Sequence, residues 1–279
     1  MKILILGGNR FVGKRAAQLL VENGHEVTLL NRGNFDDGLK GNVQRIRGDK
    51  SALATLIGDR FFDVVIDQIC MNEEDVKNAV SAFSSHTHHY ILTSTMAVYP
   101  LQYNLKESDF RPEYYRPQKA LTPLEKYSEA KRSAENALVT SAPPFSWSIA
   151  RFPIILGDDD PTRRLYEEIQ KIKNNEGLFY ENTEALFSLI HVDDAAKALC
   201  RLALHQHSGA YNFASKTPIK VSDFLKIISV KTGRQFHIDP QVSPSPFSIM
   251  KSWSMDVEKS MLLGYEYQEI SDWLPKLIS

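Results

Sequence analysis

The chain contains few of the features that mark secreted, membrane-spanning or nucleic-acid-binding proteins. Its two cysteines, Cys70 and Cys200, lie far apart among apolar neighbours, which favours buried free thiols over a disulfide or a metal site. No apolar run is long enough to span a bilayer. The formal net charge of −1 provides no bulk attraction to nucleic acid or anionic membranes. Because the first residues are typical of a strand and not of a leader peptide, we expect a soluble, cytoplasmic protein. No spacing of Cys, His and Asp is typical of a metal site, so we expect no bound metal.

What the chain does have is a glycine-rich turn at its start. An apolar run, Ile3–Leu6, leads into Gly7 and Gly8, and Gly13 follows as a helical pattern begins. A buried parallel strand has such a run, and glycines let the backbone approach a pyrophosphate at the positive end of the helix. We therefore expect a dinucleotide site that includes Gly7, Gly8, Asn9, Arg10, Phe11, Val12 and Gly13.

The rest of the first half alternates strand and helix patterns, which predicts an α/β fold with a Rossmann-type, doubly wound parallel sheet. The expected strands are Ile3–Leu6, Val27–Leu30, Val43–Arg47, Val64–Asp67, Tyr90–Thr93 and Ser146–Ala150. His88 and His89 are expected in a loop before the fifth of these strands, and residues 100–123 form a long irregular loop.

The second half is less regular and predicts a smaller C-terminal α/β lobe that binds substrate. Its helical patterns run over 160–173 and from Ser222 onward. We expect residues 1–156 and about 192–216 to form the dinucleotide-binding domain, and about 157–191 and 217–279 to form the lobe.

The end of the second strand bears on the choice of cofactor. Enzymes that use NAD usually have a carboxylate there for the ribose 2′-hydroxyl, whereas this chain has Asn31 followed by Arg32. A guanidinium matches a phosphate in a two-pronged geometry, and Arg10 adds a second cation. The pattern predicts a preference for NADP(H) and leaves NAD(H) open.

Two further stretches contain residues suited to proton transfer. Thr95 lies at the expected carboxyl end of a strand, where ligands bind in open α/β sheets. Tyr127 and Lys131 are four positions apart within a helical pattern, so they share one face. A tyrosine of ordinary pKa is a poor acid–base catalyst at neutral pH, and a nearby ammonium lowers its pKa.

Taken together, these residues resemble the extended branch of the short-chain dehydrogenase/reductase superfamily, the NAD-dependent epimerase/dehydratase-like proteins. Arg10 with Asn31, Arg32 and Gly33 is similar to an atypical subgroup that includes the chloroplast stem-loop RNA-binding proteins. The resemblance also covers Arg151–Pro153 and Ile190–Asp194.

The resemblance implies a role for each matched residue. Thr95, Tyr127 and Lys131 would be catalytic, and Lys131 would also hold the cofactor. Asp49 would lie by the adenine, and Phe152 would contact the cofactor. Our own expectation, beyond the matched residues, is that the substrate contacts Thr95, Met96, Tyr99, Tyr127 and Phe187.

The departures from the family concern the substrate. Members that act on nucleotide sugars commonly have an arginine where this chain has Phe187, and a later Arg-x-x-Asp pattern is absent around Trp253. With the tyrosines of the 100–123 loop and Tyr180, Phe187 predicts an apolar pocket.

The leading hypothesis is an NADPH-dependent reductase of a small-molecule carbonyl. The alternatives are a nucleotide-sugar 4-epimerase and a non-catalytic relative that binds RNA or senses the cofactor. We expect a small-molecule substrate, no nucleic acid and no membrane as partners, and leave a homodimer open.

Overall fold

The computed structural model describes residues 1–39, 43–118 and 122–278. Within them, seven strands form one sheet in the order β10-β6-β5-β4-β1-β2-β3, and every pairing is parallel. The strands are β1 (Lys2–Leu6), β2 (Glu26–Asn31), β3 (Val43–Arg47), β4 (Phe62–Asp67), β5 (Thr87–Thr95), β6 (Ser146–Phe152) and β10 (Gly209–Asn212). The predicted Rossmann-type sheet is therefore confirmed.

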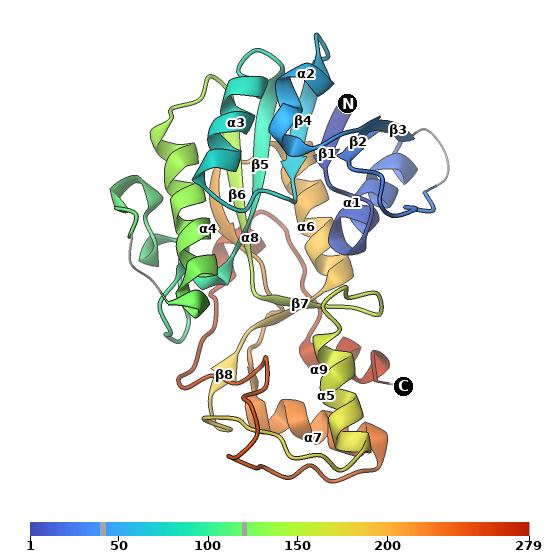
Figure 1. Ribbon diagram of the computed structural model, residues 1–279, viewed down its shortest axis with the longest axis vertical. Helices are drawn as coiled ribbons and strands as arrows, with labels where there is room; N and C mark the ends of the chain where they lie inside the picture. Colours follow the sequence, from blue (N-terminus) through green and yellow to red (C-terminus); the bar gives the residue numbers. More distant parts are fainter. Residues whose placement is uncertain (40–42, 119–121, 279) are drawn as a thin grey trace.

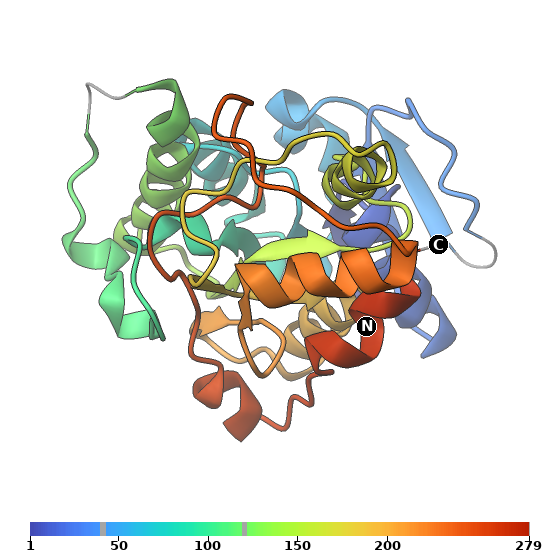
Figure 2. The ribbon, with the colours of Figure 1, turned by 90° about the horizontal axis from the view of Figure 1, so that it is seen from below.

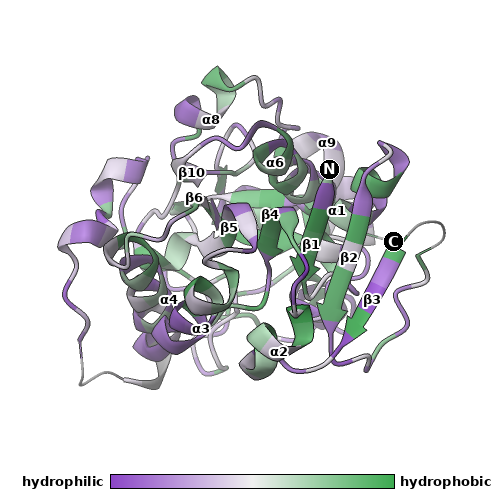
Figure 3. Cartoon of the chain, turned by 90° about the horizontal axis from the view of Figure 1, so that it is seen from above, coloured by the Kyte–Doolittle hydropathy of each residue, from purple (hydrophilic) through white to green (hydrophobic). Residues whose placement is uncertain are grey.

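Helices cover both faces of this sheet (Figures 1 and 3). On one side lie α1 (Phe11–Glu22) and α6 (Val192–His205); on the other lie α2 (Leu53–Ile57), α3 (Glu73–Phe83) and α4 (Pro123–Thr140). Because side chains alternate along a strand, Ile3 and Ile5 of β1 pack in the first layer, and Leu4 and Leu6 in the second.

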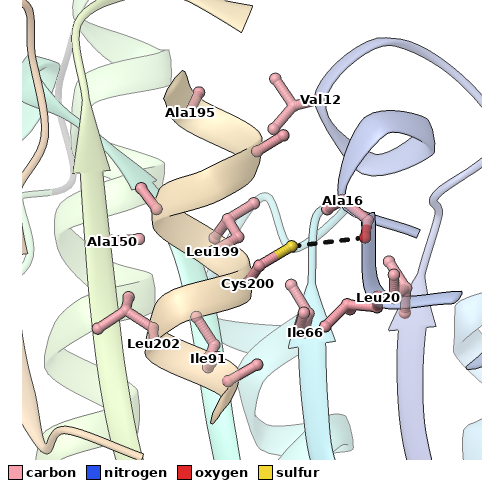
Figure 4. Packing of buried hydrophobic residues seen from close by; sticks show 14 of the residues in the cluster. Val12, Ala16, Leu20, Ile66, Ile91, Ala150, Ala195, Leu199, Cys200 and Leu202 are labelled. Atoms are coloured by element: carbon pink, nitrogen blue, oxygen red, sulfur yellow. Dashed lines mark hydrogen bonds between the residues drawn. The ribbon is translucent and has the colours of Figure 1, made fainter. Parts of the chain in front are cut away.

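The layer between the sheet, α1 and α6 also holds one of the two cysteines. Cys200 lies among small and aliphatic side chains, and its thiol donates to the Ala16 carbonyl oxygen at 3.5 Å (Figure 4). Both Cys70 and Cys200 are buried and free. Burial raises the pKa of the Cys200 thiol to about 12, so the side chain behaves as a small apolar residue.

A smaller lobe lies beyond the carboxyl ends of the sheet strands (Figure 1). Its elements are β7 (Ile154–Leu156) paired with β9 (Leu189–His191), β8 (Leu186–Phe187) paired with β11 (Ile219–Lys220), and the helices α5 (Arg164–Lys173), α7 (Val221–Thr232) and α9 (Ile270–Trp273). Figure 2, seen from below, shows α7 in orange across this end of the molecule. The lobe has a core of its own that includes Phe187, Phe224 and Phe247.

The segment 254–268 departs from the division predicted for the two domains. It contains α8 (Glu258–Leu262) and packs on the large sheet, where Lys259 Nζ donates to the Ala210 carbonyl oxygen at 2.7 Å. Met255 and Val257 belong to a cluster with Val98 and Tyr99. We propose to assign this segment to the dinucleotide-binding domain and the remaining C-terminal residues to the lobe.

Two local predictions are wrong. The helix expected from residue 160 begins at Arg164, because Asp160 accepts hydrogen bonds from the backbone and hydroxyl of Thr162 in a separate turn. His88 and His89 are not in a loop but in β5, and His89 is fully buried between the hydroxyls of Ser146 (2.6 Å) and Ser148 (2.7 Å) on β6.

In the described part of the chain, every helix is too short or too polar to cross a membrane.

Candidate functional site

The glycine turn joins β1 to α1 with little room for side chains. Gly7 and Gly8 have φ angles of 95° and 76°, which L side chains rarely adopt. A Cβ atom on Gly13 would lie 2.7 Å from the Cα atom of Gly8, so glycine is needed where the helix approaches the turn. The first turn of α1 therefore lies directly against the strand end, as a phosphate-binding helix does.

Beside this turn lies a cavity of about 410 Å³, which we call the turn pocket. Its lining residues are Gly7, Asn9, Arg10, Asn31, Arg32, Asn34, Phe35, Gly48, Asp49, Lys50, Gln68, Ile69 and Met71. Of the predicted cofactor residues, Gly8, Val12 and Gly13 pack behind the turn, and Phe11 lines another cavity instead.

The turn pocket has two cations that face no carboxylate at hydrogen-bonding distance in the described chain. The Arg10 guanidinium lies 4.1 Å from the centre of the Phe35 ring. Arg32 makes no hydrogen bond or ion pair within the described residues. The pKa of Asp49 is lowered mainly by two hydrogen bonds from Ser51 and, to a smaller extent, by the charge of Arg32. These guanidinium groups and the backbone of the turn are suited to hold the phosphates of a dinucleotide.

Asn31 has a structural task in the same pocket. Its Nδ2 donates to the Gly7 carbonyl oxygen at 3.3 Å, and its Oδ1 accepts from the Gly33 amide at 2.8 Å. The side chain thus links the glycine turn to the end of β2. A neutral amide can make both bonds at once, whereas a carboxylate has no donor for Gly7.

A second cavity, of about 630 Å³, lies between the end of the sheet and the lobe, and we call it the interlobe cleft. Thr95, at the end of β5, and Tyr127, on α4, both line it. Tyr127 is 47% exposed, and Thr95 Oγ1 accepts from the Ala97 amide at 3.2 Å, which leaves its own proton for another acceptor. Met96 and Phe187 line the same cleft.

Lys131 lies one helical turn after Tyr127 and is buried. Its Nζ donates to the carbonyl oxygens of Cys70 and Thr93, each at 2.8 Å. An ammonium has three donors, so one remains for a phenolate or for a ribose hydroxyl of a bound dinucleotide. Lys131 therefore lies on the α4 face of Tyr127, one turn away, and it is absent from the described lining of both cavities.

Asp67 is a residue of this site that sequence reasoning missed. Its Oδ1 accepts from the amides of Ile69 (2.9 Å) and Cys70 (2.8 Å), and its Oδ2 accepts from Tyr90 at 2.6 Å. These bonds hold the turn that presents the Cys70 carbonyl to Lys131. Burial raises the pKa of Asp67. The hydrogen bonds that its carboxylate accepts, and the nearby charge of Lys131, oppose that rise. A carboxylate at the end of an otherwise apolar strand was the available signal.

Some predicted substrate and cofactor residues lie elsewhere. Tyr99 is buried, donates to Asn212 Oδ1 and accepts from Arg151, both at 2.7 Å, so it supports the core instead of the substrate. Phe152 stacks on Phe213 in the core, with ring centres 5.4 Å apart, and lines neither cavity. Tyr180 is likewise buried, with its hydroxyl bonded to Glu168.

The long loop also differs from its prediction. In its described part, Tyr103 and Tyr114 are exposed and Tyr115 bonds to Glu129, and none of the three lines the interlobe cleft. Residues 119–121 of the loop lie outside the described residues. Apart from Tyr127 on α4, the aromatic side chains of the cleft come from Phe11 and from the lobe.

Comparison with known proteins places this geometry among cofactor-dependent enzymes. Residues 3–214 match the model of the NAD dependent epimerase/dehydratase family. Among curated proteins, the chain is 30% identical over 115 residues to the chloroplast stem-loop binding protein of 41 kDa b of Arabidopsis thaliana. That match spans 35% of this chain and only 30% of the relative.

Solved structures share the fold over nearly the whole chain. UDP-glucose 4-epimerase of Thermotoga maritima with UDP-glucose has a TM-score of 0.78 at 16% identity, over 100% of this chain and 97% of that one. UDP-glucuronic acid 4-epimerase of Bacillus cereus with UDP-glucuronic acid and NAD also has a TM-score of 0.78, at 18% identity over 98% and 96%. The Bordetella bronchiseptica enzyme WbmH with NAD+ has a TM-score of 0.74 at 19% identity, over 98% and 96%.

Proposed function

This chain belongs to the NAD dependent epimerase/dehydratase family, and on that premise we propose that it oxidises and re-reduces one carbinol carbon of a small molecule bound in the interlobe cleft. The observation that carries the proposal is the convergence of Thr95 and Tyr127 on one cleft, with the buried Lys131 one helical turn from Tyr127 on α4. A nicotinamide dinucleotide in the turn pocket would accept and return the hydride.

The chain's own residues would handle the proton. Tyr127 acts in its phenolate form, which takes the proton of the substrate hydroxyl during oxidation and returns it during reduction. Lys131 stabilises the phenolate through its remaining donor. The Thr95 hydroxyl donates to the same substrate oxygen and orients it. Such proton transfer contributes roughly 10²–10⁴-fold to a rate.

Epimerisation is the form of this reaction that the family supports best. The ketone formed in the first half would turn within the cleft and be reduced on its other face, so the cofactor would show no net change. The similar structures include enzymes bound to compounds that carry a nucleotide, namely UDP-glucose and UDP-glucuronic acid. They are therefore the first compounds to test on this chain.

Net reduction of a carbonyl by NADPH is the second candidate, and the turn pocket favours it. Asn31 stands where a carboxylate would repel a 2′-phosphate, and Arg10 and Arg32 line the same pocket. We propose on this basis that NADP(H) is preferred, while NAD(H), the cofactor of the similar structures, remains accessible. RNA binding, suggested by the name of the curated relative, is the third candidate.

One experiment separates epimerisation from net oxidation or reduction. The protein is incubated with NADP+ or NAD+ and with a single stereoisomer, either UDP-glucose or (R)-1-phenylethanol. An epimerase produces the other stereoisomer without net change in absorbance at the reduced-cofactor wavelength, whereas a dehydrogenase or reductase accumulates reduced cofactor. Tyr127→Phe serves as the control and should abolish either reaction. Failure of calorimetry to detect binding of any of the four cofactor forms would refute the redox proposal altogether.

A further inference from the structure

We propose that the interlobe cleft selects an uncharged substrate that places a flat apolar group against Phe187 and Trp253, and that it discriminates against nucleoside diphosphates. This inference rests on the proposed function only in placing the reacting carbon near Thr95 and Tyr127. It concerns the wall of the cleft that faces those residues from the lobe.

Phe187 and Trp253 are brought together by the backbone, although they lie far apart in the sequence. They form an isolated parallel bridge, in which Trp253 N donates to the Leu186 carbonyl oxygen at 2.7 Å and Ser188 N to the Trp253 carbonyl oxygen at 3.2 Å. The Phe187 ring is held edge-on against Phe224 and tilted against Phe247, with ring centres 5.6 and 6.4 Å apart. Both aromatic side chains line the cleft from this fixed position.

The wall that they build is mainly apolar and offers a ligand only neutral hydrogen-bonding groups. The indole Nε1 of Trp253 is shut off from water and has no partner among the described residues. The neighbouring hydroxyl oxygens of Ser188 and Ser248 accept backbone amides, from Met255 at 3.0 Å and Glu181 at 2.9 Å, and each keeps one neutral O–H donor. A ligand there therefore meets mainly ring and aliphatic surface, whose removal from water is favourable.

The charges of the cleft support the same conclusion. Asp160 and Arg164 are the charged residues among its described lining, and their formal charges cancel. A nucleoside diphosphate brings about two negative charges into a cavity with one cation and one competing carboxylate. Burying charge without pairing it is costly, so the cleft is better matched to a neutral ligand.

Calorimetry on the NADPH-bound protein tests this inference, with 1-tetralone and 2-decalone as neutral probes and UDP and UDP-glucose as charged ones. We expect the neutral ketones to bind at least tenfold more tightly than either uridine compound. Trp253→Ala should weaken 1-tetralone binding at least tenfold. Trp147→Phe, a change of the same residue type outside the cleft, should leave it unaltered.

A charge-introducing variant gives a second, opposite readout. Trp253→Arg should weaken the binding of 1-tetralone and strengthen the binding of UDP, provided that its circular dichroism spectrum matches that of the parent protein. Phe187→Leu should weaken the binding of 1-tetralone without strengthening that of UDP. Tighter binding of UDP-glucose than of both ketones, or no binding of either ketone, would overturn the inference.

The outcome is independent of turnover, because the same titrations are repeated with Tyr127→Phe. Ketone binding without any redox turnover would leave the inference standing and count against the proposed function. Epimerisation of tightly bound UDP-glucose would support the proposed function and overturn the inference.

Discussion

Replacing Lys131 with Met should destabilise the fold as well as stop the reaction, because the ammonium serves both. Its Nζ donates at 2.8 Å to two carbonyl oxygens, that of Cys70 in the loop between β4 and α3 and that of Thr93 near the carboxyl end of β5. Methionine matches the length of the side chain but has no donor. Two buried carbonyl groups would then lose their partner, and the buried carboxylate of Asp67 would lose a nearby cation.

The magnitude follows from these contacts. A hydrogen bond from a charged donor contributes about 1.5–3 kcal/mol to stability. Two such bonds, offset by the favourable burial of the methionine side chain, lead us to expect a loss of about 2–4 kcal/mol in the free energy of unfolding.

Urea denaturation followed by circular dichroism measures the loss, and Tyr127→Phe is the matched control from the same face of α4. The Tyr127 side chain is 47% exposed and makes no hydrogen bond within the described residues. Its substitution should change stability by less than about 0.5 kcal/mol while reducing turnover by roughly 10²–10⁴-fold. Equal urea midpoints for Lys131→Met and the parent protein would refute the structural role of the ammonium.

Three further outcomes are expected. Arg32→Ala should narrow the preference for NADPH over NADH by about 1.5–3 kcal/mol, measured by fluorescence titration, and equal affinities in the parent would contradict the proposed role of the guanidinium. Burial lowers the pKa of His89 to about 4. The unfolded ring, with a pKa near 6.5, is protonated first as the pH falls, so about 3 kcal/mol of stability present above pH 6.5 should be lost by pH 4; His89→Gln should flatten this dependence in urea titrations. Glu135→Ala should cost about 3–5 kcal/mol, since it leaves the Arg151 guanidinium, 2.6 Å from that carboxylate and fully buried, without its counter-ion; Glu113→Ala, which removes an exposed partner of Arg111, should cost under about 1 kcal/mol in the same denaturation assay.

Local chemistry explains why so much of the fold was predictable. Largely apolar runs specify the buried strands β1, β2 and β4, and the sheet also has the other three predicted strands, of which β3 is mostly exposed. Gly7, Gly8 and Gly13 specify a tight turn because no other residue fits there. Tyr127 and Lys131 share a face because of helical geometry alone. Each of these rests on residues close in the sequence.

Contacts between distant segments decided the remainder. His89 could be recognised as a strand residue only once Ser146 and Ser148 on the adjacent strand provided hydrogen-bonding partners. Phe187 and Trp253 make one wall because two lobe segments pair. The task of Asp67 depends on which carbonyl the folded chain offers to Lys131. The role of a polar side chain depends on its burial and on hydrogen-bonding partners from elsewhere in the chain. Neither can be predicted from the residues next to it in the sequence.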